Sequence, residues 1–232
     1  AMGENKYEQE FEISFEAPIV GAFYGELLKE LTDKNRIREI IPEAATQKVT
    51  AWDLGMSDST AIWVAEMISG EVRVMDFYEA SGESLDHYIK WLDEKGYRDY
   101  THIMPHDVNV RELQTGKSRY QFLTEAGLDI EVAPKSSVED GIQAVRRILP
   151  NCWFNKDKTR AGVECLQNYR RVFNEKTSSF QNRPLHDWSS HAADAFRYLA
   201  LGMDSTGNGQ RTDWSKPFET TLDGDSYKDY YV

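Results

Sequence analysis

The order of strand and helix signals is the feature that most restricts the fold of this chain. Three β-rich runs follow one another over residues 47–81, and Ser69-Gly70 between the second and third marks a hairpin. After residue 81 the signals alternate between helix and strand. Helical spacing covers 85–95, 118–126 and 138–149, and short apolar runs cover 101–104, 128–134 and 152–155.

Two further helices are predicted over 161–175 and 187–203, with a possible hairpin between them. A three-strand meander followed by alternating helices and strands predicts an α/β protein. We expect an RNase H-like mixed β-sheet, in which an antiparallel meander is extended by parallel strands and helices cover both faces. This is a statement about fold and carries no function by itself.

Composition divides the chain into three parts. Residues 1–46 contain one helical stretch, from about Val20 to Ile40, and are predicted to be a linker segment that packs on the domain. Residues 47–203 form the α/β domain, and residues 204–232 are predicted to be a flexible acidic C-terminal tail.

The chain of 232 residues carries a formal net charge of −12, which argues against nucleic-acid binding by the whole surface. Residues 111–183 are an exception, with 13 basic and 9 acidic side chains. No apolar run approaches the roughly 18 residues of a membrane span. Two cysteines are too few for a disulfide framework or a structural zinc site.

Three aspartates occupy positions where sites open in sheet proteins. Asp53 ends the first strand of the meander, and Asp107 follows the predicted strand 101–104. Asp187, His191 and Asp194 lie on one predicted helix at positions i, i+4 and i+7. The three are therefore expected to share one face of that helix. A single strand-end aspartate is more often a turn former or a cap, and Asp187 is most simply a helix cap.

Three carboxylates in one place repel one another, at a cost of about 4 kcal/mol for a pair ~4 Å apart at an effective dielectric of 20. Protonation or bound cations relieve this repulsion. Hard oxygen ligands suit Mg²⁺ or Mn²⁺, and two such ions roughly 3.5–4 Å apart activate a water and stabilise the leaving oxygen of a phosphodiester. The predicted metal ligands are therefore Asp53, Asp107 and Asp194, with His191 in support.

Basic side chains in the 111–183 region are candidates for contacts with DNA phosphates, although a solvated helix face explains them equally well. They are Lys117, Lys156, Lys158, Arg160, Arg170 and Arg171.

Several motifs together resemble a known family. They are "WDLGMSDSTAIW", "PHDV", "TGKSRYQFL", "VEDGIQAVRRIL" and "HDWSSHAADAFRYLA", spread over residues 49–201. This combination resembles the C-terminal nuclease domain of the large terminase subunit of tailed bacteriophages. The segment "GAFYGELLKE…NRIREIIP" further resembles the stretch that joins the ATPase domain of that family to its nuclease domain.

The resemblance implies an endonuclease that cuts concatemeric viral DNA during genome packaging in the host cell cytoplasm. It places the acidic triad of the family on Asp53, Asp107 and Asp194, with two Mg²⁺ or Mn²⁺ ions. The implied partners are double-stranded DNA, the ATPase domain, the small terminase subunit and the portal protein. No Walker pattern occurs in this chain, so no ATPase activity is expected of it.

Other classes of protein remain open from the sequence. A resolvase or transposase shares the fold, but the "PHD" and "HAADAFRY" motifs argue against it. Actin-like ATPases begin with a similar "DLG" turn, but their later glycine-rich phosphate motif is not found here. A docking module without catalysis would keep the fold and make the acidic cluster vestigial.

Overall fold

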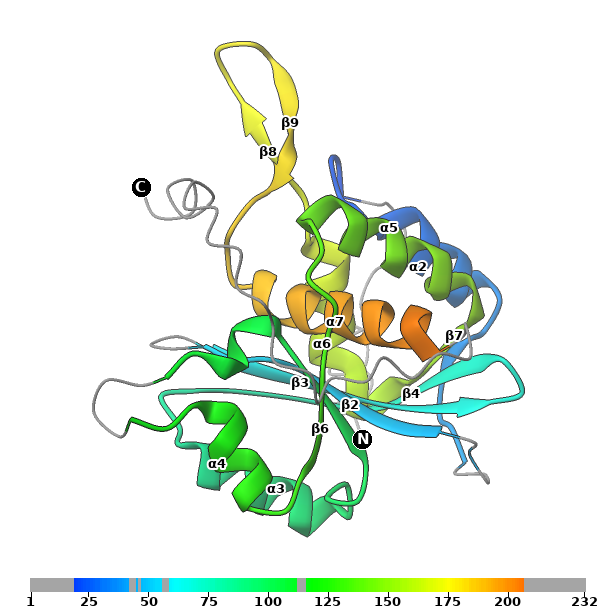
Figure 1. Cartoon of the computed structure of the whole chain (residues 1–232). Helices are drawn as coiled ribbons and strands as arrows, with labels where there is room; N and C mark the ends of the chain where they lie inside the picture. Colours follow the sequence, from blue (N-terminus) through cyan, green and yellow to red (C-terminus); the bar gives the residue numbers. More distant parts are fainter. Residues whose placement is uncertain (1–18, 42–44, 46, 56–58, 112–115, 207–232) are drawn as a thin grey trace, which may run out of the picture.

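A seven-stranded mixed sheet forms the centre of the molecule (Figure 1). The computed structural model describes residues 19–41, 45, 47–55, 59–111 and 116–206. The strand order is β1-β7-β4-β3-β2-β5-β6. The strands are β1 (Ile37–Arg38), β2 (Gln47–Asp53), β3 (Ser59–Ile68), β4 (Glu71–Ser81), β5 (Thr101–Met104), β6 (Asp129–Val132) and β7 (Cys152–Asn155).

The meander and the parallel strands occur as predicted. β2 pairs with β3, and β3 with β4, in antiparallel register. β5 and β6 extend the β2 side in parallel, while β7 and then β1 extend the β4 side in parallel. The predicted RNase H-like mixed sheet is therefore confirmed.

Helices cover both faces of the sheet (Figure 1). Four helices contribute to the larger apolar cluster on one face, and α3 and α4 pack on the other. The helices are α2 (Gly25–Asp33), α3 (Leu85–Lys95), α4 (Arg119–Glu125), α5 (Val138–Ile148), α6 (Lys156–Asn168) and α7 (Ser190–Thr206), with 3-10 turns η1 (His106–Asn109) and η2 (Leu149–Asn151). None of the helices in the described ranges is long and apolar enough to cross a membrane.

Two predicted helices are wrong in extent. The helix expected to reach Ile40 ends at Asp33, because Asn35 adopts a positive φ of 54° and the chain then pairs with β7 as β1. The helix expected over 161–175 instead spans α6, which the Asn155 side chain caps by accepting the Lys158 N–H. The predicted hairpin follows it as β8 (Arg171–Asn174) and β9 (Ser179–Pro184), which project from the body in Figure 1.

The segment before β2 contributes to the main apolar cluster. Phe23, Tyr24, Leu28 and Leu31 are all buried there. Residues 1–18 of the predicted linker, and residues 207–232 of the predicted tail, lie outside the described residues.

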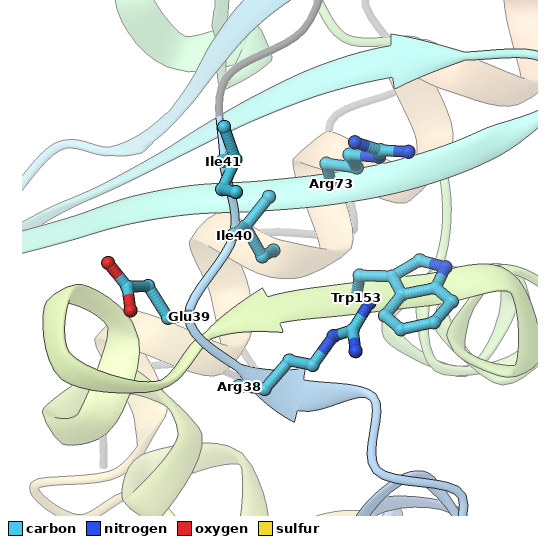
Figure 2. A pocket seen from close by; sticks show the side chains of 6 residues that line it. All are labelled: Arg38, Glu39, Ile40, Ile41, Arg73 and Trp153. Carbon is cyan, nitrogen blue, oxygen red and sulfur yellow. The ribbon is translucent and has the colours of Figure 1, made fainter.

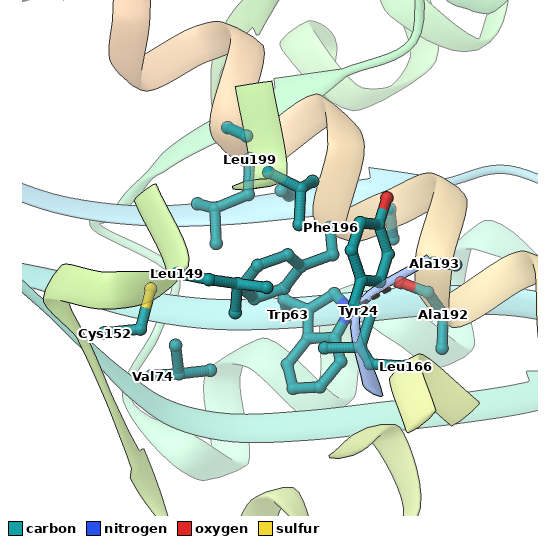
Figure 3. Packing of buried hydrophobic residues seen from close by; sticks show 14 of the residues in the cluster. Tyr24, Trp63, Val74, Leu149, Cys152, Leu166, Ala192, Ala193, Phe196 and Leu199 are labelled. Atoms are coloured by element: carbon teal, nitrogen blue, oxygen red, sulfur yellow. Dashed lines mark hydrogen bonds between the residues drawn. The ribbon is translucent and has the colours of Figure 1, made fainter. Parts of the chain in front are cut away.

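Helix α7 lies close against the sheet because its inner face is built largely from alanine. Ala192, Ala193 and Ala195 have no exposed surface. Trp63 of β3 is also fully buried, and its indole N–H donates a 2.7 Å hydrogen bond to the Ala192 carbonyl oxygen (Figure 3). This bond fixes the first turns of α7 over the antiparallel meander.

Helix α6 packs against the same tryptophan through a glycine. A Cβ added at Gly162 would lie 2.6 Å from Trp63 Cζ2 and 2.7 Å from Phe77 Cγ. Only glycine therefore allows α6 to reach this position without displacing aromatic rings of β3 and β4.

We expect Gly162→Ala to lower the free energy of unfolding by about 1–3 kcal/mol, the usual cost of overpacking a core. The sign is diagnostic, because Gly→Ala at an open helix position stabilises by about 1 kcal/mol. Urea denaturation measures the change, with Ala161→Ser on the exposed side of α6 as the control. A stabilised Gly162→Ala variant would contradict the close packing.

Candidate active site

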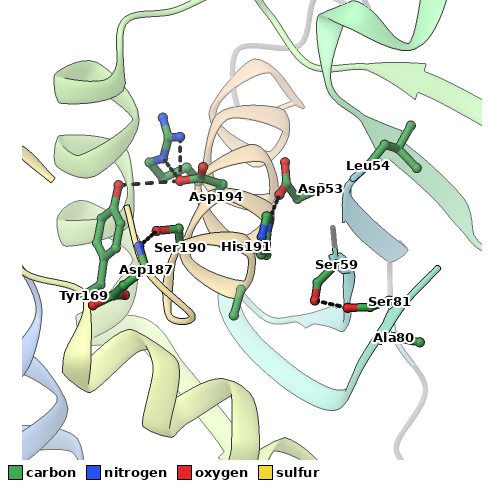
Figure 4. A network of polar contacts seen from close by, with 12 residues as sticks. Asp53, Leu54, Ser59, Ala80, Ser81, Tyr169, Asp187, Ser190, His191 and Asp194 are labelled. Atoms are coloured by element: carbon green, nitrogen blue, oxygen red, sulfur yellow. Dashed lines mark hydrogen bonds and ion pairs between the residues drawn. The ribbon is translucent and has the colours of Figure 1, made fainter. Parts of the chain in front are cut away.

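The site begins at the last residue of β2. Asp53 pairs with Ala61 of β3, and its neighbour two residues earlier, Ala51, points into the cluster beneath α7. The Asp53 side chain therefore faces the same helix, as strand alternation requires. There its Oδ2 lies 3.1 Å from Nδ1 of His191 (Figure 4).

Asp194 lies three residues after His191 on α7, and its carboxylate is held from behind. Arg197 reaches Oδ1 with Nη2 at 2.7 Å and Nε at 3.2 Å. The hydroxyl of Tyr169 donates to the same oxygen at 3.5 Å (Figure 4). All three contacts are made to Oδ1, so this clamp fixes the orientation of the carboxylate and leaves Oδ2 for another role.

Asp53 is in an environment that disfavours its charge. Burial raises its pKa most, the hydrogen bond with His191 lowers it, and the negative charge of Asp194 raises it again, to about 6. The side chain is only 19% exposed. A cation at this position would relieve both the desolvation and the repulsion between Asp53 and Asp194.

Asp107 lies in η1, directly after β5, which pairs with β2. Asp107 and the other two aspartates all act electrostatically on the phenol of Tyr198 in α7. Burial raises the pKa of the Tyr198 phenol, and the charges of Asp53, Asp194 and Asp107 raise it further. Asp107 thus lies near enough to α7 for its charge to act on Tyr198 together with those of Asp53 and Asp194.

The three carboxylates do not form a closed metal cage. Within the ranges that the structure describes, no three His, Cys, Asp or Glu side chains come close enough together to hold an ion. The structure places Asp53 next to His191, directs the Asp194 carboxylate toward Arg197 and Tyr169, and leaves Asp107 at the neighbouring strand end. In donor chemistry the set fits a hard divalent cation, because it offers carboxylate oxygens.

Asp187 lies before α7 and not on its face. Its carboxylate accepts hydrogen bonds from the Ser189 N–H and hydroxyl at 3.0 and 2.6 Å, and the helix starts at Ser190. Asp187 also forms a 3.4 Å ion pair with Arg170. The predicted shared face of Asp187, His191 and Asp194 is therefore wrong for Asp187, which organises the turn that leads into α7.

The six predicted DNA-contact residues are scattered. Lys156, Lys158 and Arg160 are exposed at the start of α6, whereas Tyr169, which contacts Asp194, follows the end of that helix. At a rise of ~1.5 Å per residue, the Cα atoms of these three cations lie roughly 13–20 Å before Tyr169 along α6.

Partners are described for Lys117, Arg170 and Arg171 as well. Lys117 pairs with Glu125 at 2.6 Å, and Arg170 pairs with Asp187 as described above. The Arg171 guanidinium carbon lies 4.7 Å from the ring centroid of Phe23. A role in DNA contact stays a prediction for all six.

Sequence reasoning misses the residues that hold and surround the carboxylates. Tyr169 lies within a stretch whose periodicity predicts helix, and Arg197 and Tyr198 lie in a helical motif that gives them no role of their own. The signal that identifies Arg197 is its spacing, since a cation three residues after Asp194 lies on the same helix face.

Comparison with known proteins finds solved structures of the same fold but no related sequence. No family profile matches the sequence, and no curated protein sequence matches it significantly. Solved structures do match. A large terminase from a thermophilic bacteriophage superimposes with a TM-score of 0.58 at 17% identity, over 74% of this chain and 43% of that one.

Two separate nuclease domains match over most of their own length. The P22 large terminase nuclease domain gives a TM-score of 0.56 at 16% identity, covering 73% of this chain and 89% of that one. The large terminase nuclease from thermophilic phage G20c with bound magnesium gives 0.54 at 11% identity, covering 79% and 98%. The chain has the fold of these nuclease domains, and it spans less than half of the first large terminase.

We expect the metal-free protein to lose stability as pH rises through the range in which Asp53 ionises. The pKa of Asp53 is raised from 3.8 to about 6 on folding, so the folded state holds this proton more tightly than the unfolded state. Below pH ~4 this proton makes its full contribution to the free energy of unfolding. The contribution falls by about 3 kcal/mol as pH rises from ~4 through 6.

Urea denaturation in EDTA at several pH values measures this loss as the difference between wild type and Asp53→Asn. Asp99→Asn, at an exposed position before β5, is the matched control. Equal pH profiles for wild type and Asp53→Asn would contradict the assignment.

Proposed function

We propose that this chain is a divalent-metal-dependent endodeoxyribonuclease that cuts concatemeric viral DNA during genome packaging. One observation carries the proposal, namely that Asp53 at a strand end contacts His191 of α7, three residues before Asp194, on the fold of terminase nuclease domains. The burial of Asp53 next to a second carboxylate is costly for the fold unless a cation offsets it.

Asp53, Asp107 and Asp194 would hold the metal. Two Mg²⁺ or Mn²⁺ ions would supply Lewis-acid stabilisation of the phosphodiester and a lower pKa for water. The G20c nuclease of the same fold has been solved with bound magnesium, which supports the choice of ion.

The protein's own side chains prepare this site. The Arg197–Tyr169 clamp holds Oδ1 of Asp194 and so presents the carboxylate in one orientation. His191 faces Asp53 with Nδ1, and in the neutral ring this nitrogen can donate its proton to the carboxylate. His191 thus orients the Asp53 carboxylate in the proposed site.

The setting in a packaging motor is part of the same proposal. An ATPase domain, a small terminase subunit, a portal protein and double-stranded DNA are the partners that this function requires, in the cytoplasm of the infected cell. The fold shared with the longer phage large terminase, of which this chain spans 43%, supports that setting.

Plasmid nicking tests the reaction. We expect wild type to nick supercoiled DNA with Mn²⁺ or Mg²⁺, and to be inactive in EDTA or with Ca²⁺ alone. Asp53→Asn, Asp107→Asn and Asp194→Asn should each lower the rate by about 100-fold or more, because each removes an anionic ligand. Asp99→Asn is the control with the same chemical change, at an exposed position before β5, whereas Asp107 follows the other end of that strand.

The outcomes separate the alternatives. Cleavage in EDTA would exclude metal dependence, and full activity in all three aspartate variants would show that the site is wrong. A wild type that is inactive with every ion would favour a non-catalytic docking module.

Metal binding is testable without activity. We expect millimolar Mn²⁺ to raise the Tm of wild type by several degrees, because an ion that binds only the folded state stabilises it. Asp53→Asn and Asp194→Asn should lose this shift. An unchanged wild-type Tm would contradict a metal site formed by these carboxylates.

A further inference from the structure

The four residues before α2, here called the strap (residues 21–24), lead into the main apolar cluster. Phe23 and Tyr24 at its end are buried. Gly21 at its start has a φ of 85°, a conformation that favours glycine. A Cβ at this position would also lie 2.5 Å from Cε1 of Phe180. The strap therefore follows one defined path into the interior.

The strap is hydrogen-bonded to the chain at the end of α6 and to α5. The Phe23 N–H donates to the Tyr169 carbonyl oxygen at 2.9 Å, and the Arg171 N–H donates to the carbonyl oxygen of Gly21 at 3.0 Å. From the other side, Arg146 of α5 donates Nε and Nη2 to the Phe23 carbonyl oxygen at 3.2 and 3.1 Å. Both peptide groups of Phe23 are thus fixed between α5 and the end of α6.

Tyr169, which the strap holds, is the residue that contacts Asp194. Its ring centroid lies 5.2 Å from that of Phe23 and 5.8 Å from that of Tyr24, which stacks on it at an interplanar angle of 20°. Its hydroxyl donates to Oδ1 of Asp194 at 3.5 Å (Figure 4). Because this distance is at the upper limit for a hydrogen bond, a small displacement of the ring breaks it.

Tyr24 supports this contact through its ring and not through its hydroxyl. The hydroxyl is buried and has no hydrogen-bond partner among the residues that the structure describes. Burial raises the pKa of this phenol most, and Tyr169 and Asp194 add to the rise, so Tyr24 lies close to the groups that hold the carboxylate. Phenylalanine at this position would keep the support of Tyr169, whereas an aliphatic side chain would remove the stacked ring.

We propose that the strap positions Asp194 as a metal ligand, by holding Tyr169 against its carboxylate. The inference rests on the function proposed above and adds that one ligand of the ion depends on a segment before the sheet. Phe23 and Tyr24 are positioning residues, since they act through Tyr169. A residue that holds a metal ligand in place typically changes the metal affinity by about 10-fold or more when it is removed. Displacement of the strap would therefore weaken the metal site without altering any ligand.

The first test uses the ¹⁵N-labelled protein in EDTA and needs neither metal nor activity. Arg197 donates its Nε–H to the same Oδ1 of Asp194 at 3.2 Å, so the signal of this group reports the position of the carboxylate. Arg197→Lys identifies the signal. We expect Tyr24→Leu, which removes the ring, and Arg146→Met, which removes the donors to Phe23, to shift or broaden it. Tyr24→Phe should leave it as in wild type.

Two controls separate positioning from a general loss of stability. Leu31→Ala truncates a buried side chain of α2 in the same cluster, and it should lower the Tm without moving the Arg197 signal. Arg147→Met makes the arginine-to-methionine change at the next, exposed position of α5 and should also leave the signal unchanged. A signal that moves equally in Leu31→Ala, or that moves in neither Tyr24→Leu nor Arg146→Met, would overturn the proposal.

The second test titrates Mn²⁺ and follows the rise in Tm of each protein above its own metal-free value. Tyr24→Leu and Arg146→Met should bind Mn²⁺ about 10-fold more weakly than wild type, and Tyr24→Phe should match wild type. Equal affinity in all four proteins would overturn the role of the strap. A wild type whose Tm does not respond to Mn²⁺ would contradict the proposed function instead, and the Arg197 signal then decides alone whether the strap positions Asp194.

Discussion

The contact between α7 and the sheet is the constraint on which the site depends. Alanines at 192, 193 and 195 allow the helix axis to come close to β2 and β3, and the indole of Trp63 fixes its height by bonding the Ala192 carbonyl. A larger side chain on that face would lift the helix and separate His191 from Asp53. The geometry of the polar site is thus set by apolar packing directly beneath it.

Polar side chains around α7 then fix the orientation of the Asp194 carboxylate. Arg197 and Tyr169 hold one oxygen of Asp194, and Tyr169 in turn stacks on Tyr24 with ring centroids 5.8 Å apart. Tyr24 is completely buried and precedes α2. The segment before the sheet therefore belongs to the support of the carboxylate, although its sequence pattern suggests only a packing linker.

Sequence pattern predicts what depends on local periodicity and on strand ends. The meander, the strand-end position of Asp53 and the shared helix of His191 and Asp194 all follow from spacing. The shared face fails for Asp187, because its carboxylate bonds Ser189 before the helix starts, as the alternative reading of a helix cap implies. A cavity lined by Arg38, Arg73 and Trp153 (Figure 2) is also not predictable from local pattern, since strand pairing between distant segments assembles it.

The lengths of the outer strands have a consequence for solubility. The sheet ends in β1, with two residues, on one side and in β6, with four, on the other. Such short borders offer few unpaired backbone groups, and β6 also carries Asp129 and Glu131. A second copy of the chain finds little edge to extend by strand pairing, so the sheet is protected from edge-to-edge aggregation.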